Sequence, residues 1–427
     1  MTAIAKVYAR RVWDSRGRPT VEAEVTLTDG SIGRGIAPAG ASRGTREAID
    51  LRDGGTKLGG LDVQRAVANV NGEVARTLIG RDADNQAGID HALIALDGTP
   101  NKARLGGNAT VAVSIAALYA SAQSAGKPLW ERVSEGRLIS MPLPEIQIFG
   151  GGAHAGRRVD IQDFMVMPLG ATTFAEAMEM TAEVYIAAGA LMREAGKLAG
   201  VADEGGWWPV FHANEEALEM LTRAIEKAGF AHRDMAISLD IAASEFGRDG
   251  RYELGLEKRK LDTSGLIDML GKWLETYPIV SIEDPLAEDD EAGLIEFTRR
   301  FGARVQIIGD DYLVTNAARV ERAAHIKAVN SALIKLNQAG TVTETKAALD
   351  AAKAAGMTTL VSARSGETED VTITHLAIGW NAGQLKVGSF ARSERMAKWN
   401  EAIRIEESSK AAFVGRGALT APMSGVN

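Results

Sequence analysis

The feature that most restricts the fold is an alternation of short apolar segments with amphipathic helical segments, which fills the chain beyond residue 141. Helical periodicity is clearest at 214–228, 263–277 and 341–355. Serial strand–helix units over residues 138–427 favour a (β/α) barrel over an open doubly wound sheet, and no G-x-G-x-x-G follows a strand to suggest a Rossmann domain. We predict strands at 164–167, 236–240, 279–283, 306–310, 332–336, 358–361 and 384–387.

The first part of the chain has a different pattern. Residues 21–27 alternate apolar or small with polar side chains, a turn signal follows, and 31–36 is typical of a returning strand, so we predict a hairpin. After a loop of small residues at 37–44, the pattern becomes helical from Thr45 to about Val133. Strands followed by helices predict an α+β unit, and we place the domains at 1–137 and 138–427.

Composition excludes several classes of function. The chain has 427 residues and no cysteine, so disulfides, thiolate metal sites and cysteine nucleophiles are impossible. A formal net charge of −8 disfavours a nucleic-acid or anionic-membrane binder, although a local basic pocket for a small anion remains possible. No segment approaches the roughly 20 apolar residues of a membrane span, and no apolar signal core is present near the first residues. We therefore expect a soluble, cytoplasmic protein.

Charged side chains stand where several predicted strands end. Asp240, Glu283 and Asp310 each end an apolar segment, and Lys335 ends the next one. In a barrel the C-terminal strand ends share one mouth, so these side chains should converge. One such acid would be explained equally well as a helix cap or a solvated residue. Three in successive units predict a site for a hard cation with oxygen ligands, Mg²⁺ rather than Zn²⁺.

Other segments carry groups suited to catalysis or anion binding. Lys335 and Lys386 lie in or at the end of apolar strands, where a lysine needs a carboxylate or ligand anion as partner, or else reaches solvent from a strand edge. Arg364 and Ser365 lie in a turn that could bind phosphate or be an ordinary loop. Glu204 stands on a glycine-flanked loop, where it could act as an acid or simply be solvated.

Together these segments resemble the enolase family over nearly the whole chain. The resemblance implies an α/β protein with an N-terminal α+β cap domain followed by an enolase-type α/β (TIM-like) barrel. It also implies a cytoplasmic homodimer or higher homo-oligomer that uses Mg²⁺, with two ions per site. The stretches that carry it are 14–22, 47–54, 159–165, 203–206, 334–338 and 364–370.

The resemblance also implies roles for individual residues. Asp240, Glu283 and Asp310 match the carboxylate ligands of one metal ion, and Ser42 matches a lid serine that helps bind the second. Lys335 matches the base that removes the C2 proton of 2-phosphoglycerate.

Further matches concern the leaving hydroxyl and the substrate. Glu204 matches the acid that protonates the departing 3-hydroxyl, and Asp163 stands in the position of its partner carboxylate. Residues matching substrate-binding positions are Lys386, Arg364, Ser365, Gln162 and His154.

The chain departs from the family pattern near these same positions. Asp163 replaces a glutamate and Ala363 replaces a histidine. The loop 150–158 loses two acids and gains Arg157 and Arg158, and the first lid carries Arg43. Trp207 and Trp208 replace smaller residues. The changes add positive charge, stacking surface and room, which would suit a larger, more anionic or nucleotide-bearing co-substrate.

Three hypotheses follow. The first is enolate chemistry on 2-phosphoglycerate or phosphoenolpyruvate by a specialised enolase. The second is a transferase similar to carboxyphosphonoenolpyruvate synthase of phosphonate biosynthesis, which would join a phosphonylated, cytidine-nucleotide-bearing unit to an enolpyruvate. The third is a non-catalytic enolase-like binding protein, which the presence of Lys335 and the three metal acids disfavours.

Overall fold

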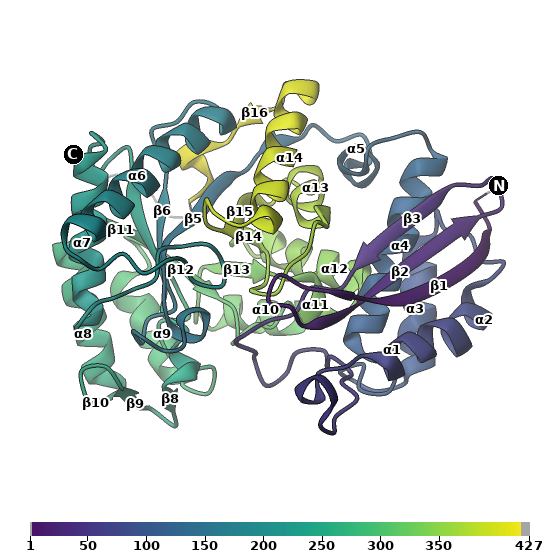
Figure 1. The fold of residues 1–427 in the computed structure, drawn as a ribbon, viewed down its shortest axis with the longest axis horizontal. Coiled ribbons are helices and arrows are strands. Elements are labelled where there is room, and N and C mark those ends of the chain that lie inside the picture. The colour runs from purple at the N-terminus through teal and green to yellow at the C-terminus, as the bar shows by residue number, and fades with distance from the viewer. Residues whose placement is uncertain (1, 420–427) are drawn as a thin grey trace.

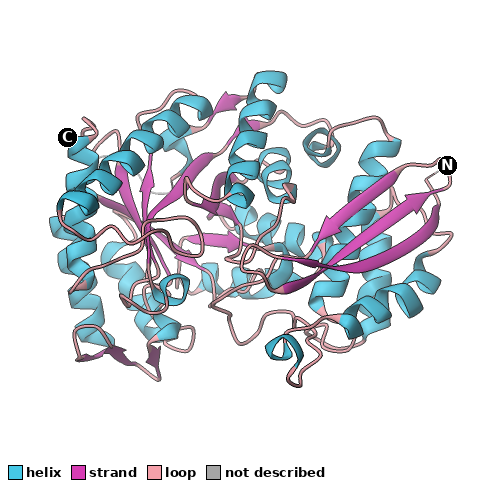
Figure 2. Ribbon diagram, viewed as in Figure 1, coloured by secondary structure: helices cyan, strands magenta, loops and turns pink. Residues whose placement is uncertain are grey.

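The computed structural model describes residues 2–419, which form an N-terminal unit beside a barrel. Figure 1 shows the N-terminal unit in purple and blue on the right and the barrel on the left. Helices surround the barrel strands, whereas the N-terminal sheet is covered by helices on one side (Figure 2). No helix within residues 2–419 is both long enough and apolar enough to cross a membrane.

The N-terminal unit is an antiparallel three-stranded sheet packed on an alanine-rich helix. The sheet has the order β1 (Ile4–Trp13), β2 (Pro19–Leu27) and β3 (Ile32–Ile36), and α4 (Gly107–Ser124) packs on β2 and β3. A Cβ on Gly33 would lie 2.0 Å from a backbone oxygen of α4, so only glycine allows this close approach. The other helices are α1 (Gln64–Asn69), α2 (Ala75–Leu78), α3 (Gln86–Asp97) and α5 (Leu129–Ser134), with a 3-10 turn at Lys57–Gly60 and a π turn at Val70–Val74.

The structure corrects the sequence interpretation of this unit in two places. The strand β1 was not predicted, because a register irregularity between Ile4 and Lys6 and its long polar side chains hide the alternation. Residues 45–56 are not helical. Their backbone bonds instead to distant segments, as when Ala48 N–H donates to Gln338 O and Ile49 N–H donates to Asn101 O.

The remaining chain closes an eight-stranded barrel in the order β11-β12-β13-β14-β15-β5-β6-β7. The strand β5 was missed from sequence because Pro144 lies near its start, where proline weakens a strand signal. The strands are β5 (Leu143–Gly150), β6 (Asp163–Met167), β7 (Ala236–Asp240), β11 (Ile279–Glu283), β12 (Gln306–Gly309), β13 (Ser331–Ile334), β14 (Thr358–Ser362) and β15 (Gly383–Gly388).

Helices and short strands complete the barrel domain. The helices predicted at 214–228, 263–277 and 341–355 correspond closely to α7 (Asn214–Lys227), α8 (Thr263–Thr276) and α12 (Val342–Ala354). The helices are α6 (Phe174–Glu194), α7 (Asn214–Lys227), α8 (Thr263–Thr276), α9 (Glu291–Phe301), α10 (Ala317–His325), α11 (Leu336–Ala339), α12 (Val342–Ala354), α13 (Thr372–Gly379) and α14 (Ser393–Ser409). Small sheets pair β4 (Ser140–Met141) with β16 (Ala412–Phe413), and β8 (Gly247–Arg248) with β9 (Arg251–Leu254) and β10 (Arg259–Asp262). Short 3-10 turns lie at Gly152–Ala155, Ala243–Glu245 and Gly415–Ala418.

One barrel strand runs against the others. The strand β6 is antiparallel to both β5 and β7, with Asp163 paired to Asp240 in register. An antiparallel strand begins at the mouth where its parallel neighbours end. The start of β6 therefore places Gln162 and Asp163 at the same mouth as the strand-end acids.

Contacts between the two units bring an N-terminal loop to this mouth. Backbone N–H groups of Ala39 and Gly366 each donate to the other residue's carbonyl. Buried Asp90 accepts hydrogen bonds from the backbone N–H and hydroxyl of Thr343 at the start of α12. The Ala39–Gly366 pair holds the loop that contains Ser42 against the barrel, and the Asp90–Thr343 bonds join α3 to α12.

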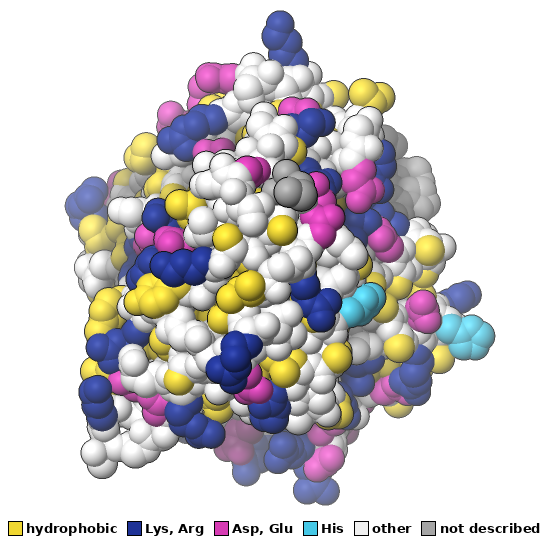
Figure 3. All heavy atoms as spheres, turned by 90° about the vertical axis from the view of Figure 1, so that its right-hand side faces the viewer, with side chains coloured by type: hydrophobic (Ala, Val, Ile, Leu, Met, Phe, Trp, Pro, Cys, Tyr) yellow, Lys and Arg dark blue, Asp and Glu magenta, His cyan; other side chains and the backbone are white. Residues whose placement is uncertain are grey.

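The outer face of the N-terminal unit carries mixed charge. Among the described residues visible in Figure 3, lysine and arginine side chains are interspersed with acidic and apolar ones rather than gathered by sign. Such a surface differs from the basic stripe of a nucleic-acid-binding domain.

Candidate active site

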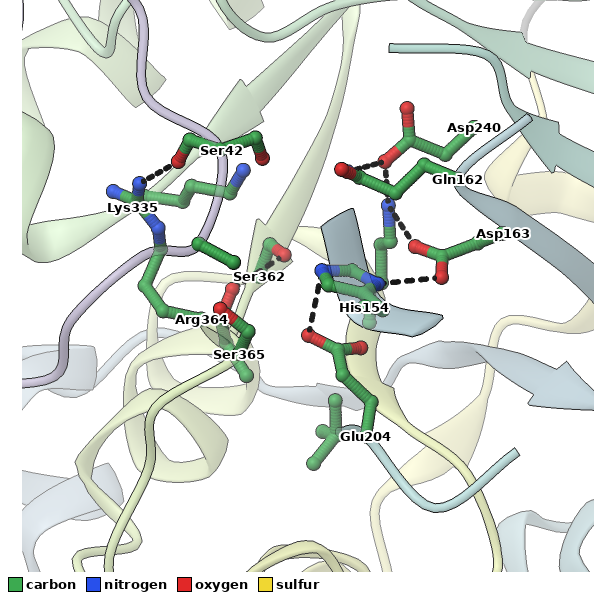
Figure 4. A pocket seen from close by; sticks show the side chains of 14 residues that line it. Ser42, His154, Gln162, Asp163, Glu204, Asp240, Lys335, Ser362, Arg364 and Ser365 are labelled. Carbon is green, nitrogen blue, oxygen red and sulfur yellow. Dashed lines mark hydrogen bonds and ion pairs between the residues drawn. The ribbon is translucent and has the colours of Figure 1, made fainter. Parts of the chain in front are cut away.

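A buried pocket lies where the barrel mouth meets the N-terminal loop (Figure 4). It brings together side chains from the loop after β3, the start of β6, the loop before α7, and the ends of several barrel strands. The lining residues are Ala41, Ser42, His154, Gln162, Asp163, Glu204, Asp240, Lys335, Ser362, Ala363, Arg364, Ser365, Lys386 and Val387. Most residues singled out from the sequence are therefore neighbours in space.

Two lysines stand among the strand-end acids. Lys386 Nζ lies 2.6 Å from Glu283 Oε2 and 3.0 Å from Asp240 Oδ2. Lys335 Nζ donates to Asp310. Burial alone would raise the pKa of Asp310, but the cationic groups of Lys335, Arg364 and Lys386 together outweigh it and lower that pKa. Glu283 and Asp310 lie just behind the lining side chains and contact them through the lysines.

The donor set fits a hard divalent cation. Glu283 Oε1, Asp163 Oδ2 and Gln162 Oε1 are buried and have no hydrogen-bond partner among the described residues, although Asp163 Oδ2 lies 3.7 Å from Lys386 Nζ. Unsatisfied buried oxygens are costly and rare, so they indicate a missing cationic or donor partner. Carboxylate and amide oxygens are the ligands that Mg²⁺ prefers.

Beside Asp310 lie two further acids, Asp284 and Asp311, that were not singled out from the sequence. Asp284, Asp310 and Asp311 are buried, and each offers an oxygen within 4.8 Å of the others. The Asp284 carboxylate accepts the backbone N–H groups of Asp310 and Asp311, each at 2.8 Å. Burial, followed by repulsion from Asp310, raises the pKa of both Asp284 and Asp311 well above the usual range. The doubled acids in Glu283-Asp284 and Asp310-Asp311 were the available signal.

Arg364 joins the N-terminal loop to the barrel. Its Nη1 lies 2.9 Å from Glu47 Oε2 and donates to Asn337 Oδ1 at 2.9 Å, and its Nη2 donates to the Ser42 carbonyl at 2.9 Å. A Cβ on Gly40 would lie 1.9 Å from Nη2 and 2.7 Å from the Ser42 carbonyl oxygen, so any side chain there would displace this packing. Glu47 and Asn337 lie within stretches that carry the family resemblance, but neither was singled out from the sequence as a site residue.

His154 lies between two acids. Its Nδ1 is 2.8 Å from Asp163 Oδ1 and its Nε2 is 3.6 Å from Glu204 Oε1. Burial would lower the pKa of His154, but the carboxylates of Asp163 and Glu204 outweigh it and raise that pKa to about 9. Gln147 donates to Asp163 and accepts from the Gly206 N–H at 2.8 Å, which ties Asp163 to the Glu204 loop.

The structure does not bring the three added arginines into the pocket. Arg157 pairs with Glu245 at 2.8 Å and its side chain is 68% exposed. Arg43 donates to the Ala48 carbonyl at 3.2 Å, and Arg158 is not among the lining residues. Trp207 is not a free stacking surface either, because its ring is already stacked on Tyr185 with centroids 4.7 Å apart.

Comparison with known proteins gives a consistent result over both units. Residues 4–133 match the family model described as the enolase N-terminal domain, and residues 138–421 match that of the enolase C-terminal TIM barrel domain. The chain is similar to Enolase 1 of Desulfitobacterium hafniense (strain Y51). The two are 48% identical over 424 residues, which cover 98% of this chain and 97% of the relative.

Proposed function

This chain belongs to the enolase family and is an enolase-superfamily lyase, and from that premise we propose that it dehydrates 2-phosphoglycerate to phosphoenolpyruvate with Mg²⁺. The observation that carries the proposal is a single buried pocket lined by a lysine, a carboxylic acid and an arginine beside the strand-end acids. Proton abstraction next to a carboxylate needs such a base together with concentrated positive charge.

The cation would be held by the barrel acids. Asp240, Glu283 and Asp310 supply anionic oxygens, and we assign Ser42 to a second ion when the loop closes. When bound, Mg²⁺ supplies positive charge that stabilises a developing enolate. The unpaired Glu283 oxygen supports this assignment.

The remaining side chains divide the proton chemistry and the binding. Lys335 accepts the C2 proton through Nζ, and Glu204 donates a proton to the departing 3-hydroxyl. Burial lowers the pKa of Lys335, but the carboxylates of Asp310 and Glu283 outweigh this effect and raise that pKa. We assign Lys386 to the substrate carboxylate, and Arg364 and Ser365 to the phosphate.

Other assignments complete the proposal. Gln162 and His154 line the substrate side of the pocket. We propose domain limits at 1–137 and 138–427, which the matches of the two family models to residues 4–133 and 138–421 support. We also propose that the chain forms a homodimer or larger homo-oligomer, which light scattering of the purified protein would test.

The direct test is the appearance of the phosphoenolpyruvate double bond by ultraviolet absorbance after 2-phosphoglycerate is added with Mg²⁺. We expect product from the wild type and none after chelation with EDTA. Glu204→Gln is the matched control, since it removes the acid and keeps the side-chain shape. Absence of product from the wild type at any Mg²⁺ concentration contradicts the proposal.

A second candidate is a transferase acting on a larger phosphonylated co-substrate. It is favoured by Ala363, which lines the pocket where the family usually has a histidine, and by the shortened Asp163. The positions of Arg43, Arg157 and Arg158 give it no support, because these arginines do not line the pocket. Binding of a cytidine nucleotide to the purified protein would favour this candidate.

The double reversion Asp163→Glu, Ala363→His separates adaptation from drift. Restoring the longer acid and the histidine should raise 2-phosphoglycerate turnover about 10-fold or more, since general acid–base help is typically worth about 10²–10⁴-fold. Steady-state kinetics of the wild type and double variant provide the measurement. Equal turnover in both proteins indicates that the two replacements are neutral.

A further inference from the structure

A turn of the N-terminal unit reaches the wall of the pocket. Residues 14–18 join β1 to β2, and their backbone is docked on the segment that follows β14. The Ser15 N–H donates to the Glu367 carbonyl at 2.8 Å, and the Ser15 hydroxyl donates to the Ser365 carbonyl at 3.3 Å. The turn therefore holds its next residue, Arg16, against one of the residues assigned above to the phosphate.

The guanidinium of Arg16 joins three separate segments. Its Nη1 donates to Ser365 Oγ at 3.2 Å, and its Nη2 donates to the Ala39 carbonyl at 2.8 Å. The same Nη2 lies 3.2 Å from Asp14 Oδ2, and the Arg16 side chain is only 5% exposed. Because a guanidinium is planar and presents its donors in fixed directions, these bonds fix its orientation.

Gly366 leaves the space that this guanidinium occupies. A Cβ at position 366 would lie 2.4 Å from both Arg16 Nη2 and Asp14 Oδ2, and 2.8 Å from the Ala39 carbonyl oxygen. Asp14 is itself fixed, because its Oδ1 accepts the backbone N–H groups of Arg16 and Arg18 at 2.8 and 2.9 Å. Arg16 is therefore held from the side of the N-terminal unit as well as from the barrel.

The contact with Arg16 decides which way the Ser365 hydroxyl can donate. A hydroxyl has one proton and two acceptor lone pairs, whereas a guanidinium only donates. Ser365 Oγ therefore uses a lone pair on Arg16, and its own proton has no acceptor among residues 2–419. The Ser365 backbone is fixed too, since its carbonyl accepts from Arg395 Nη2 at 2.5 Å. Ser365 lines the pocket beside Arg364 (Figure 4), so this proton is available to a bound anion.

We propose that Arg16 is a positioning residue that orients the Ser365 hydroxyl as a hydrogen-bond donor to the substrate phosphate. The proposal rests on the function assigned above, and it adds a residue of the N-terminal unit to the phosphate site. Arg16 is not among the residues that line the pocket, so it acts through Ser365 rather than on the phosphate directly. A donor that is oriented before the anion arrives loses less freedom on binding, which strengthens the complex.

Titration with inorganic phosphate, followed by calorimetry, tests the proposal without turnover. Arg16→Gln and Ser365→Ala should each weaken phosphate binding about tenfold, because each removes an oriented hydrogen bond to a charged group. The double variant should lose no more than either single variant, since Arg16 acts through a hydroxyl that is already absent. A role limited to holding the loop at 37–44 would cost affinity with or without that hydroxyl. Losses that multiply in the double variant therefore overturn the proposal.

A second arginine of the N-terminal unit provides the matched control. Arg52 Nη2 lies 3.4 Å from Asp50, two residues earlier, and its Nη1 donates to the Pro19 and Leu61 carbonyls. The surroundings of Arg52 thus resemble those of Arg16, but Arg52 has no contact with the residues of the pocket. Arg52→Gln should leave the phosphate affinity unchanged.

Arg16→Lys separates orientation from charge. It keeps the positive charge beside Asp14 but not the planar pair of donors, so it should still weaken phosphate about fivefold. It also takes the place of Arg16→Gln in the double-variant comparison if that protein fails to fold. Wild-type affinity in Arg16→Lys would mean that charge alone is sufficient, which overturns the proposal.

Kinetics with 2-phosphoglycerate give a second measurement. Arg16→Gln should raise KM about tenfold and leave kcat within about twofold, because the phosphate is bound alike before and during the reaction. A loss in kcat with an unchanged KM overturns the role in phosphate binding.

The two levels of the proposal fail differently. A wild type that binds phosphate but makes no phosphoenolpyruvate contradicts the proposed function, and the phosphate titrations then still decide the role of Arg16. A wild type that makes phosphoenolpyruvate, with phosphate affinity equal in Arg16→Gln and wild type, overturns the role of Arg16 alone. A wild type that binds no phosphate overturns that role as well.

Discussion

Lys335→Ala should abolish exchange of the substrate's α-proton with solvent deuterium while leaving substrate binding measurable. Lys335 directly follows β13 and lines the pocket, where its Nζ contacts Asp310. Removing the base leaves no other assigned group to take the C2 proton, so the exchange rate should fall by on the order of 10²–10⁴-fold or more. Proton NMR of 2-phosphoglycerate in deuterated buffer measures this rate.

A second lysine provides the control for this variant. Lys353 is exposed and donates to the Trp380 and Asn381 carbonyls, away from the pocket. Lys353→Ala removes a lysine outside the pocket and should leave exchange unchanged. Exchange at the wild-type rate in Lys335→Ala would remove Lys335 from the role of base.

Alanine at any one of Asp240, Glu283 or Asp310 should weaken Mg²⁺ binding and the thermal stabilisation that Mg²⁺ provides. In the proposed site each residue supplies anionic oxygen to the same hard cation. A ligand at 100 times its Kd stabilises the folded state by about 2.7 kcal/mol, and this increment should disappear in the variants. Isothermal titration calorimetry and melting curves with and without Mg²⁺ measure the effect independently of activity.

The choice of variants guards against a general loss of stability. Removing one acid leaves Lys386 or Lys335 short of a buried partner, so Asp240→Asn and Asp310→Asn, which keep the shape, should be compared with the alanine variants. Asp268→Ala removes an exposed acid and should bind Mg²⁺ as the wild type does. Wild-type titrations for all three alanine variants would contradict the metal assignment.

Local patterns in the sequence were sufficient for the barrel and most of its strands. The segments 236–240 and 279–283 coincide with β7 and β11. A short apolar segment between two helices is too short for a helix of its own and is most readily buried as a strand. Asp240 and Lys335 could be recognised in the same way, because each stands where an apolar run ends. The strand β5 was not predicted from the sequence, because proline at position 144 disfavours a strand in the local pattern.

Other features depend on contacts between residues far apart in the chain. The direction of β6 cannot be predicted from its own five residues, yet it decides that Asp163 lies at the mouth that holds the strand-end acids. Arg157 was expected to face an anionic co-substrate, but Glu245, 88 residues away, binds it at the surface. The sequence gives the sign of each charge, whereas the tertiary structure determines which residue forms an ion pair with it.

The sequence by itself determined the family, most of the barrel strands and the identity of the strand-end acids and lysines, because these follow from local periodicity and contiguous motifs. Only the tertiary structure decided which of these groups touch. It placed His154 between Asp163 and Glu204 and Lys386 between Asp240 and Glu283. The physical reason is that a buried charge is stable only when it is paired. The pairing depends on distances of a few ångströms between side chains, and only the folded arrangement of distant segments fixes these distances.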